Sequence, residues 1–142
     1  MYSASPSPDG LLDTNIFVHA HTTDRHSNEC RGFLAALERG DVEARLEPVV
    51  LHELTYVLPR YLKQMSRTDL AAYLLTILGW TGVRGDTALM VDAVERWRTT
   101  PRLAFVDAHL AALAGRNSCA VFSVNRAELR AQGIDVPQPL PG

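Results

Sequence analysis

The amino-acid sequence predicts a three-layer α/β/α sandwich built around a mainly parallel central sheet. Short strand-like segments alternate with amphipathic helix-like segments along the chain, and neither an internal repeat nor a central linker interrupts the alternation. Strands that alternate with helices are typical of βαβ units, whose strands pair in parallel. A chain of 142 residues suits one domain, and a domain of this size buries roughly 70% of the surface of its unfolded chain.

The first half of the chain supplies two strands and three helices to this prediction. Leu11 and Leu12 form a short buried strand that ends near Asp13, and a helix follows it. Residues 27–39 form a helix that Ser27 could cap and that Gly40 would end. Residues 45–50 are strand-like, whereas apolar residues at helical spacing predict a helix over 51–61.

The second half continues the alternation. Residues 66–69 spell a capping box that opens a helix, residues 80–84 form a short strand, and Asp86 caps a helix that ends before Pro101. The remaining elements are a helix over 103–114, a strand over 119–124, a short helix over 126–131 and an edge strand over 134–136.

Composition sets the domain boundaries and the cellular setting. Residues rich in Pro, Ser and Gly predict flexible tails at 1–9 and 137–142, which leaves one domain over 10–136. The chain start lacks a secretory signal, and no apolar run approaches the roughly 20 residues that span a bilayer. Two distant cysteines indicate neither a disulfide framework nor a zinc site. We therefore expect a cytoplasmic protein without a membrane partner.

The charge balance excludes a protein that holds nucleic acid by bulk charge, because the formal net charge is −2. Lys63 is the only lysine, and the other cations are arginines, which suit bidentate phosphate contacts. A compositional bias explains the same excess of arginine. The candidates for local phosphate contacts are Arg84, Arg102, Arg126 and Arg130.

Two acids follow expected strands and also have ordinary structural explanations. Asp13 comes directly after the first strand, where it could cap the next helix. Glu53 lies early in the helix after the second strand, where the helix dipole would stabilise its charge. Neither position establishes a site by itself.

Asp107 is harder to explain by local structure. Leu103, Leu110 and Ala114 lie four residues before it and three and seven after it, so the sequence places Asp107 on the apolar face of its helix. A buried charge needs a partner, such as an arginine, a group of backbone amides or a metal ion. A buried salt bridge is the structural alternative.

Asn125 completes the set at the end of the expected strand over 119–124. Asn125 and Glu128 also fit a capping box for the helix that follows. The carboxyl ends of parallel strands meet at one edge of a sheet, where ligands bind. Clustered carboxylates at such an edge would repel one another unless a divalent cation joined them, and oxygen ligands favour Mg²⁺ or Mn²⁺. A hydrated cation of this kind serves phosphodiester hydrolysis.

Four segments in this order resemble the motifs of PIN domains. They are residues 11–18 (LLDTNIFV) with Asp13, residues 49–54 (VVLHEL) with Glu53, residues 105–114 (FVDAHLAALA) with Asp107, and residues 121–126 (VFSVNR) with Asn125. Each motif alone is weak, whereas the ordered set is fairly specific and spans residues 10–136.

The resemblance implies a ribonuclease that needs Mg²⁺ or Mn²⁺ and leaves 5′-phosphate and 3′-hydroxyl ends. A single-domain chain of this length is similar to VapC-type toxins of type II toxin–antitoxin pairs. That likeness implies a homodimer that cleaves RNA and is silenced by a cognate antitoxin. It assigns the cation to Asp13, Glu53 and Asp107, and gives Asn125 an assisting role.

One position departs from the family pattern, because Asn125 stands where the family usually has an aspartate. The loss of one negative charge predicts weaker metal binding. The alternative function is therefore a catalytically weakened module that binds RNA or a protein partner. A third hypothesis, a domain that binds a small anion, lacks the Gly-rich phosphate loop that it would need.

Several neighbouring residues have two interpretations. The hydroxyls of Thr14 and Ser123 could orient metal ligands, or could serve local capping. Asn15 could hydrogen-bond to Asp13 or stabilise the turn. His19, His21 and His26 lack the tighter spacing of metal ligands, so we expect them to be surface residues.

Overall fold

The computed structural model describes residues 10–142, so the predicted tail over 1–9 lies outside the described residues. The chain divides into two compact units, which are described separately here. Unit 1 contains the described residues up to Met65 together with Thr76–Asp86, and unit 2 contains Ser66–Leu75 and Thr87–Gly142. No helix among residues 10–142 combines the length and the apolar character that crossing a bilayer requires.

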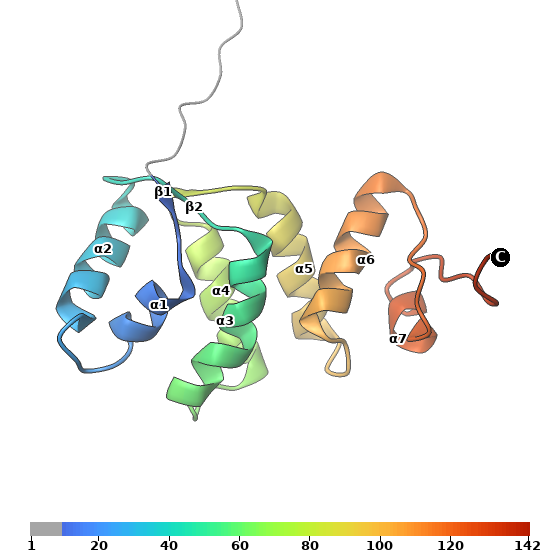
Figure 1. Ribbon diagram of the computed structural model, residues 1–142, viewed down its shortest axis with the longest axis horizontal. Coiled ribbons are helices and arrows are strands. Elements are labelled where there is room, and N and C mark those ends of the chain that lie inside the picture. The colour runs from blue at the N-terminus through green and yellow to red at the C-terminus, as the bar shows by residue number, and fades with distance from the viewer. Residues whose placement is uncertain (1–9) are drawn as a thin grey trace, which may run out of the picture. The chain divides into compact units, whose positions relative to one another are not determined.

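The element order confirms a mixed α/β fold with a parallel sheet (Figure 1). Three strands form a sheet in the order β1-β2-β3, consistent with a PIN-like α/β/α fold. The elements are β1 (Gly10–Leu11), α1 (Thr14–Ala20), α2 (Ser27–Arg39), β2 (Ala44–Arg45), α3 (Pro48–Tyr61), α4 (Arg67–Leu78), β3 (Val83–Arg84), α5 (Thr87–Thr99), α6 (Phe105–Asn117) and α7 (Arg126–Arg130).

The sheet belongs to unit 1 and its strands are short. Ala44 of β2 lies opposite Gly10 of β1 on one side and Val83 of β3 on the other. The strand expected over 45–50 was too long, because α3 begins at Pro48. Proline suits the first helical turn, where its missing N–H group would have no partner in the helix. Leu11 of β1 is 74% exposed, and the buried Leu12 follows the strand, so β1 itself is not the buried strand that the sequence predicts.

The helix α2 has the predicted bounds but a different start. Gly40 ends it in the left-handed conformation with φ 83°, as its position predicts. His26 occupies the N-cap position, and Ser27 makes no cap. The Ser27 hydroxyl is buried and donates to the Thr22 carbonyl oxygen at 2.6 Å. It therefore stabilises the loop between α1 and α2 rather than the helix end.

The capping box at the start of α4 is confirmed in both directions. The Asp69 N–H donates to the Ser66 hydroxyl at 3.0 Å, and the Ser66 N–H donates to the Asp69 carboxylate at 3.3 Å. Two N–H groups at a helix start are thereby satisfied. α4 begins in unit 2, and its last residues belong to unit 1.

Arg67 holds together the connection between α5 and α6 in unit 2. Its guanidinium donates to the carbonyl oxygens of Trp97 at 2.7 Å, Thr100 at 3.1 Å and Leu103 at 2.6 Å. The same group lies over the Trp97 ring, 4.3 Å from its centroid. Partial burial lowers the pKa of Arg67, but an arginine stays charged in proteins. The cation therefore satisfies carbonyl groups where α5 ends and the chain turns at Pro101.

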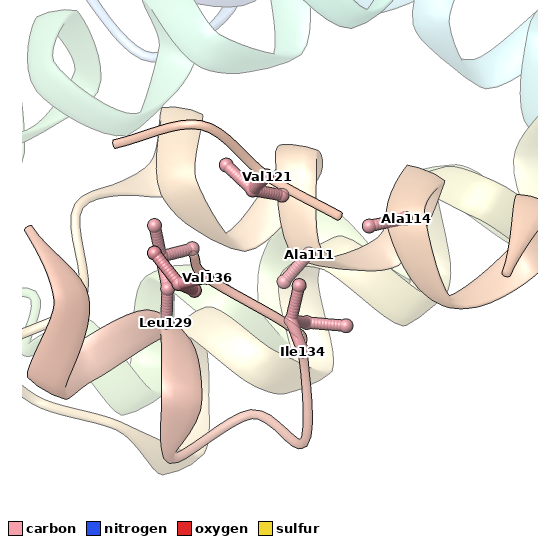
Figure 2. Packing of buried hydrophobic residues seen from close by; sticks show 6 residues of the cluster. All are labelled: Ala111, Ala114, Val121, Leu129, Ile134 and Val136. Carbon is pink, nitrogen blue, oxygen red and sulfur yellow. The ribbon is translucent and has the colours of Figure 1, made fainter. Parts of the chain in front are cut away.

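The end of the chain packs without the two strands that the sequence predicts. Neither 119–124 nor 134–136 forms a strand, and the segments share one hydrogen bond from the Val121 N–H to the Asp135 carbonyl at 2.9 Å. Val121, Ile134 and Val136 are buried, whereas Phe122 is 67% exposed and Val124 is 77% exposed. An apolar segment also needs a continuous hydrogen-bonded partner to form a strand. Figure 2 shows a core cluster from α6, α7 and these segments: Ala111, Ala114, Val121, Leu129, Ile134 and Val136.

Gly82 makes a close backbone approach that predicts intolerance to any side chain. Its N–H donates to the Leu37 carbonyl at 2.9 Å. A Cβ at Gly82 would clash with the Val42 carbonyl oxygen and lie 2.6 Å from that of Leu37. We expect Gly82→Ala to lower the free energy of unfolding in urea by about 2 kcal/mol or more.

Gly32→Ala is the matched control, because a Cβ there meets open space inside α2. It should leave stability unchanged or raise it by up to about 1 kcal/mol. Equal urea midpoints for the two variants would contradict the close approach at Gly82.

The Arg67 contacts predict that charge alone cannot replace the guanidinium. We expect Arg67→Lys to lower the free energy of unfolding by about 1–3 kcal/mol, because an ammonium cannot reach the same carbonyls in one plane. Arg60→Lys, an exposed site on α3, is the control and should change stability by less than about 0.5 kcal/mol. An unchanged urea midpoint for Arg67→Lys would show that the three carbonyl contacts contribute little.

Candidate acidic site

The four main site candidates divide equally between the two units. Asp13 and Glu53 belong to unit 1, and Asp107 and Asn125 belong to unit 2. Asp13 and Glu53 form one half of the predicted site, and Asp107 and Asn125 form the other.

Asp13 occupies the N-cap position of α1 with an extended backbone, φ −104° and ψ 147°. Its side chain makes no capping hydrogen bond and is exposed. Asp13 is thus at the predicted N-cap position, but its carboxylate does not cap the helix as predicted. The Asn15 amide donates to the Asp13 carboxylate at 3.4 Å, a long contact. Asp13 follows the carboxyl end of β1, where parallel sheets bind ligands.

Glu53 loses the structural explanation that its sequence position suggests. Because α3 begins at Pro48, Glu53 lies in the second helical turn, and the first turn contains no acidic residue. Stabilisation by the helix dipole fades beyond the first turn, so that explanation is wrong. The residue is half-buried, and in unit 1 its helix packs against α1.

Asp107 gains a structural explanation that its sequence position did not suggest, and it is less buried than predicted. It is half-buried, not buried, and Leu110 on the same face is 39% exposed. α6 begins at Phe105, so Leu103 lies before the helix and Asp107 lies in its first turn. A carboxylate in a first turn is stabilised by the helix dipole. The argument from a buried, unpartnered charge is therefore wrong for Asp107.

The partner of Asp107 is Asn125. The Asn125 amide donates to the Asp107 carboxylate at 2.8 Å, across 18 positions of sequence. Asn125 occupies the N-cap position of α7, but its side chain makes no capping hydrogen bond, so the predicted capping box with Glu128 is wrong. The Asn125 amide instead connects the start of α7 to the first turn of α6.

An amide at position 125 gives a different electrostatic interaction with Asp107 than the aspartate of the family pattern would give. Two carboxylates about 4 Å apart repel by roughly 4 kcal/mol at an effective dielectric of about 20. An amide replaces that repulsion with a charge-assisted hydrogen bond. Asp107 and Asn125 therefore form a stable pair without a cation between them.

Two hydroxyls support the halves of the site locally. Thr14 is buried as the first residue of α1. The Ser123 hydroxyl accepts from the Asn125 N–H at 2.9 Å, which shapes the turn that carries the amide. The contact of Ser123 favours a local structural role over direct binding of a ligand.

Three of the arginine candidates have protein partners. Arg84 forms an ion pair with Glu43 at 2.7 Å and donates to the Thr81 carbonyl. Arg126 donates to the Pro137 carbonyl at 3.3 Å, and Arg130 donates to the Val136 carbonyl at 2.7 Å. Arg102 is exposed and lines a cavity of about 380 Å³ in unit 2.

The donor chemistry of the four candidates suits a hard divalent cation, because carboxylate and amide oxygens are the ligands that Mg²⁺ accepts. Within residues 10–142, no three His, Cys, Asp or Glu side chains gather into a metal-binding group. The residue types fit the cation, whereas an assembled centre is not part of the described structure.

A cavity of about 480 Å³ lies beside Asp13 in unit 1, and the sequence did not predict it. His19 and His26, interpreted as surface residues, line it with their rings 5.1 Å apart. His19 shares a 2.8 Å hydrogen bond with the Asp24 carboxylate. The sequence signal for this contact was Asp24, which lies five residues after His19. A short loop after a helix can place its carboxylate within hydrogen-bond distance of a side chain on that helix.

Comparison with known proteins identifies the family but no individual relative. No curated protein and no solved structure matches the chain. The PIN domain family matches residues 10–132, a span that contains Asp13, Glu53, Asp107 and Asn125. The match covers most of the chain, and the described structure has the mixed α/β fold with a parallel sheet that the family implies. The chain therefore belongs to the PIN domain family, a family with a nuclease fold.

Proposed function

We propose that this protein is a metal-dependent endoribonuclease. The observation that carries the proposal is the Asp13 carboxylate, which lies exposed at the carboxyl end of β1 and does not cap the helix that it precedes. An acid in this place, inside the family span, is available to a ligand. Family membership supports nuclease chemistry at such an acid.

In this proposal Asp13, Glu53 and Asp107 hold Mg²⁺, with Mn²⁺ as a substitute, and their carboxylates supply hard oxygen ligands. A cation held by these residues would supply Lewis-acid chemistry, which would favour ionisation of a bound water and stabilise charge on the phosphoryl group.

The other residues orient the substrate and the ligands. The Asn125 amide orients the Asp107 carboxylate through their 2.8 Å hydrogen bond. Exposed Arg102 is the candidate for an RNA phosphate, because the other three arginines are engaged by the protein.

The biological role follows from the VapC-type resemblance, and we include it in the proposal. The protein would act as the toxin of a type II pair, form a homodimer and be silenced by a cognate antitoxin. We expect expression of the protein to arrest growth and the product of an adjacent gene to relieve that arrest, as measured by growth assays with and without co-expression. A protein that cleaves RNA in vitro without arresting growth contradicts the toxin role and leaves the nuclease proposal intact.

Removal of one carboxylate tests the cation site. We expect the wild-type protein to cleave RNA with Mg²⁺ or Mn²⁺, and we expect EDTA or Asp13→Ala to slow cleavage by about a hundredfold or more. Asp41→Ala removes an exposed acid that pairs with Arg39, and should leave the rate within about twofold. Robust cleavage in both EDTA and Asp13→Ala would place the chemistry elsewhere.

Asn125→Asp tests the meaning of the amide. The substitution places two carboxylates side by side, so we expect tighter Mg²⁺ binding together with a loss of about 1–3 kcal/mol of stability without the cation. Urea unfolding with and without Mg²⁺ measures both effects, and Mg²⁺ should restore much of the loss.

The same variant separates the proposal from the weakened-module alternative. An inactive wild type that gains cleavage through Asn125→Asp would favour a protein that binds without cutting. An active wild type would exclude that alternative.

A further inference from the structure

The cavity beside Asp13 has the size and the wall of a ligand site. Its volume of about 480 Å³ lies within the range of small-molecule pockets. Asp13 and Asn15 line it from the start of α1, and Phe33 of α2 contributes a half-buried aromatic ring. All of its lining residues belong to unit 1. A group bound here would lie next to the acid that the proposed function assigns to the cation.

A hydrogen-bonded loop holds the histidine wall of this cavity in place. The Asp24 carboxylate accepts from His19 Nδ1, the Thr22 hydroxyl and the His26 N–H, each at 2.8 Å. The hydrogen bonds from His19, Thr22 and His26, in that order of effect, hold the pKa of Asp24 well below its usual range. The ionised carboxylate fixes the His19 ring, which meets the His26 ring edge-on at 5.1 Å. The two imidazoles therefore form a preorganised wall.

The charge of the lining selects a neutral occupant. Asp13 and Glu29 contribute carboxylates, and none of the described lining residues is Arg or Lys. Burial raises the pKa of the Cys30 thiol, and nearby Glu29 and Asp24 raise it further, so this thiol is a neutral part of the wall. A phosphate would be repelled by these carboxylates, whereas a flat neutral group could stack on the aromatic side chains.

We propose that this cavity binds a base of the RNA strand next to the scissile phosphate, with Phe33 and the histidines as stacking surfaces and Glu29 as the polar contact. The proposal rests on the proposed function for its choice of substrate. Proteins recognise single-stranded RNA by stacking bases on aromatic rings and by hydrogen bonds to base edges. A carboxylate only accepts hydrogen bonds, so Glu29 favours bases with an exocyclic amino group over uracil, whose N3–H lies between two carbonyl oxygens that repel a carboxylate.

Cytidine and uridine are suitable probes, because their bases have nearly the same size but different edges. Cytosine has a 4-amino group beside an N3 acceptor, whereas uracil has a 4-carbonyl beside an N3–H. Neutral nucleosides also avoid repulsion between a phosphate and the lining. In NMR titrations of the full chain without metal, we expect both to shift the signals of Ile16, His19 and Phe33, with cytidine binding about tenfold more tightly. Absence of shifts at these residues would overturn the subsite.

Two variants and one control test the assigned contacts. Phe33→Leu keeps an apolar side chain but removes the ring, and should weaken both nucleosides by about tenfold. Glu29→Gln should bring the two affinities within about twofold, because an amide both donates and accepts hydrogen bonds. Glu38→Gln changes another exposed glutamate of α2 that does not line the cavity, and should retain the preference. Equal binding of cytidine and uridine to the wild type would overturn the role of Glu29.

These titrations require neither metal nor cleavage, so they separate the two proposals. RNA cleavage by a protein whose cavity signals do not move would refute the subsite and support the nuclease. Cytidine binding in the cavity of a protein that never cleaves RNA would support the subsite and refute the nuclease.

Discussion

The connection that leads into α6 depends on one half-buried cation, Arg67, whose guanidinium hydrogen-bonds to backbone carbonyl groups. Arg67 donates to three carbonyl oxygens between the end of α5 and Leu103, and its plane also covers Trp97. Carbonyl groups at a helix end need partners, and a guanidinium can satisfy several of them in one plane. The turn that Arg67 holds sets the first residue of α6, and with it the place of Asp107 in a first helical turn.

Local signals in the sequence predicted some helix ends and not others, because the expected side-chain caps of Asp13, Ser27 and Asn125 do not form. The capping box of Ser66 and Asp69 and the glycine at position 40 act within a few residues, so their spacing predicts their contacts. The strand over 119–124 failed because strand formation depends on a partner that the segment itself does not specify. The contact between Asn125 and Asp107 joins residues 18 positions apart, which helical or strand periodicity cannot predict.

Errors in two predicted helix starts explain why the structural interpretations of Glu53 and Asp107 were wrong. Glu53 was discounted because of the helix dipole, but Pro48 begins its helix early enough to place it beyond the first turn. Asp107 was favoured as a buried charge, but its helix begins later than expected, which leaves it half-buried and near the dipole. An error of two or three residues in a helix start therefore reverses an electrostatic argument, while the order of the motifs is unaffected.

The pair of Asp107 and Asn125 has a consequence for how a polyanion approaches this part of the molecule. Only one member of the pair is charged, so an approaching phosphodiester meets one negative charge there instead of two. Repulsion before any cation arrives is correspondingly smaller, and it is screened within about 10 Å at moderate ionic strength. Under the proposed function, a nucleic-acid strand could therefore come near Asp107 before a cation binds there.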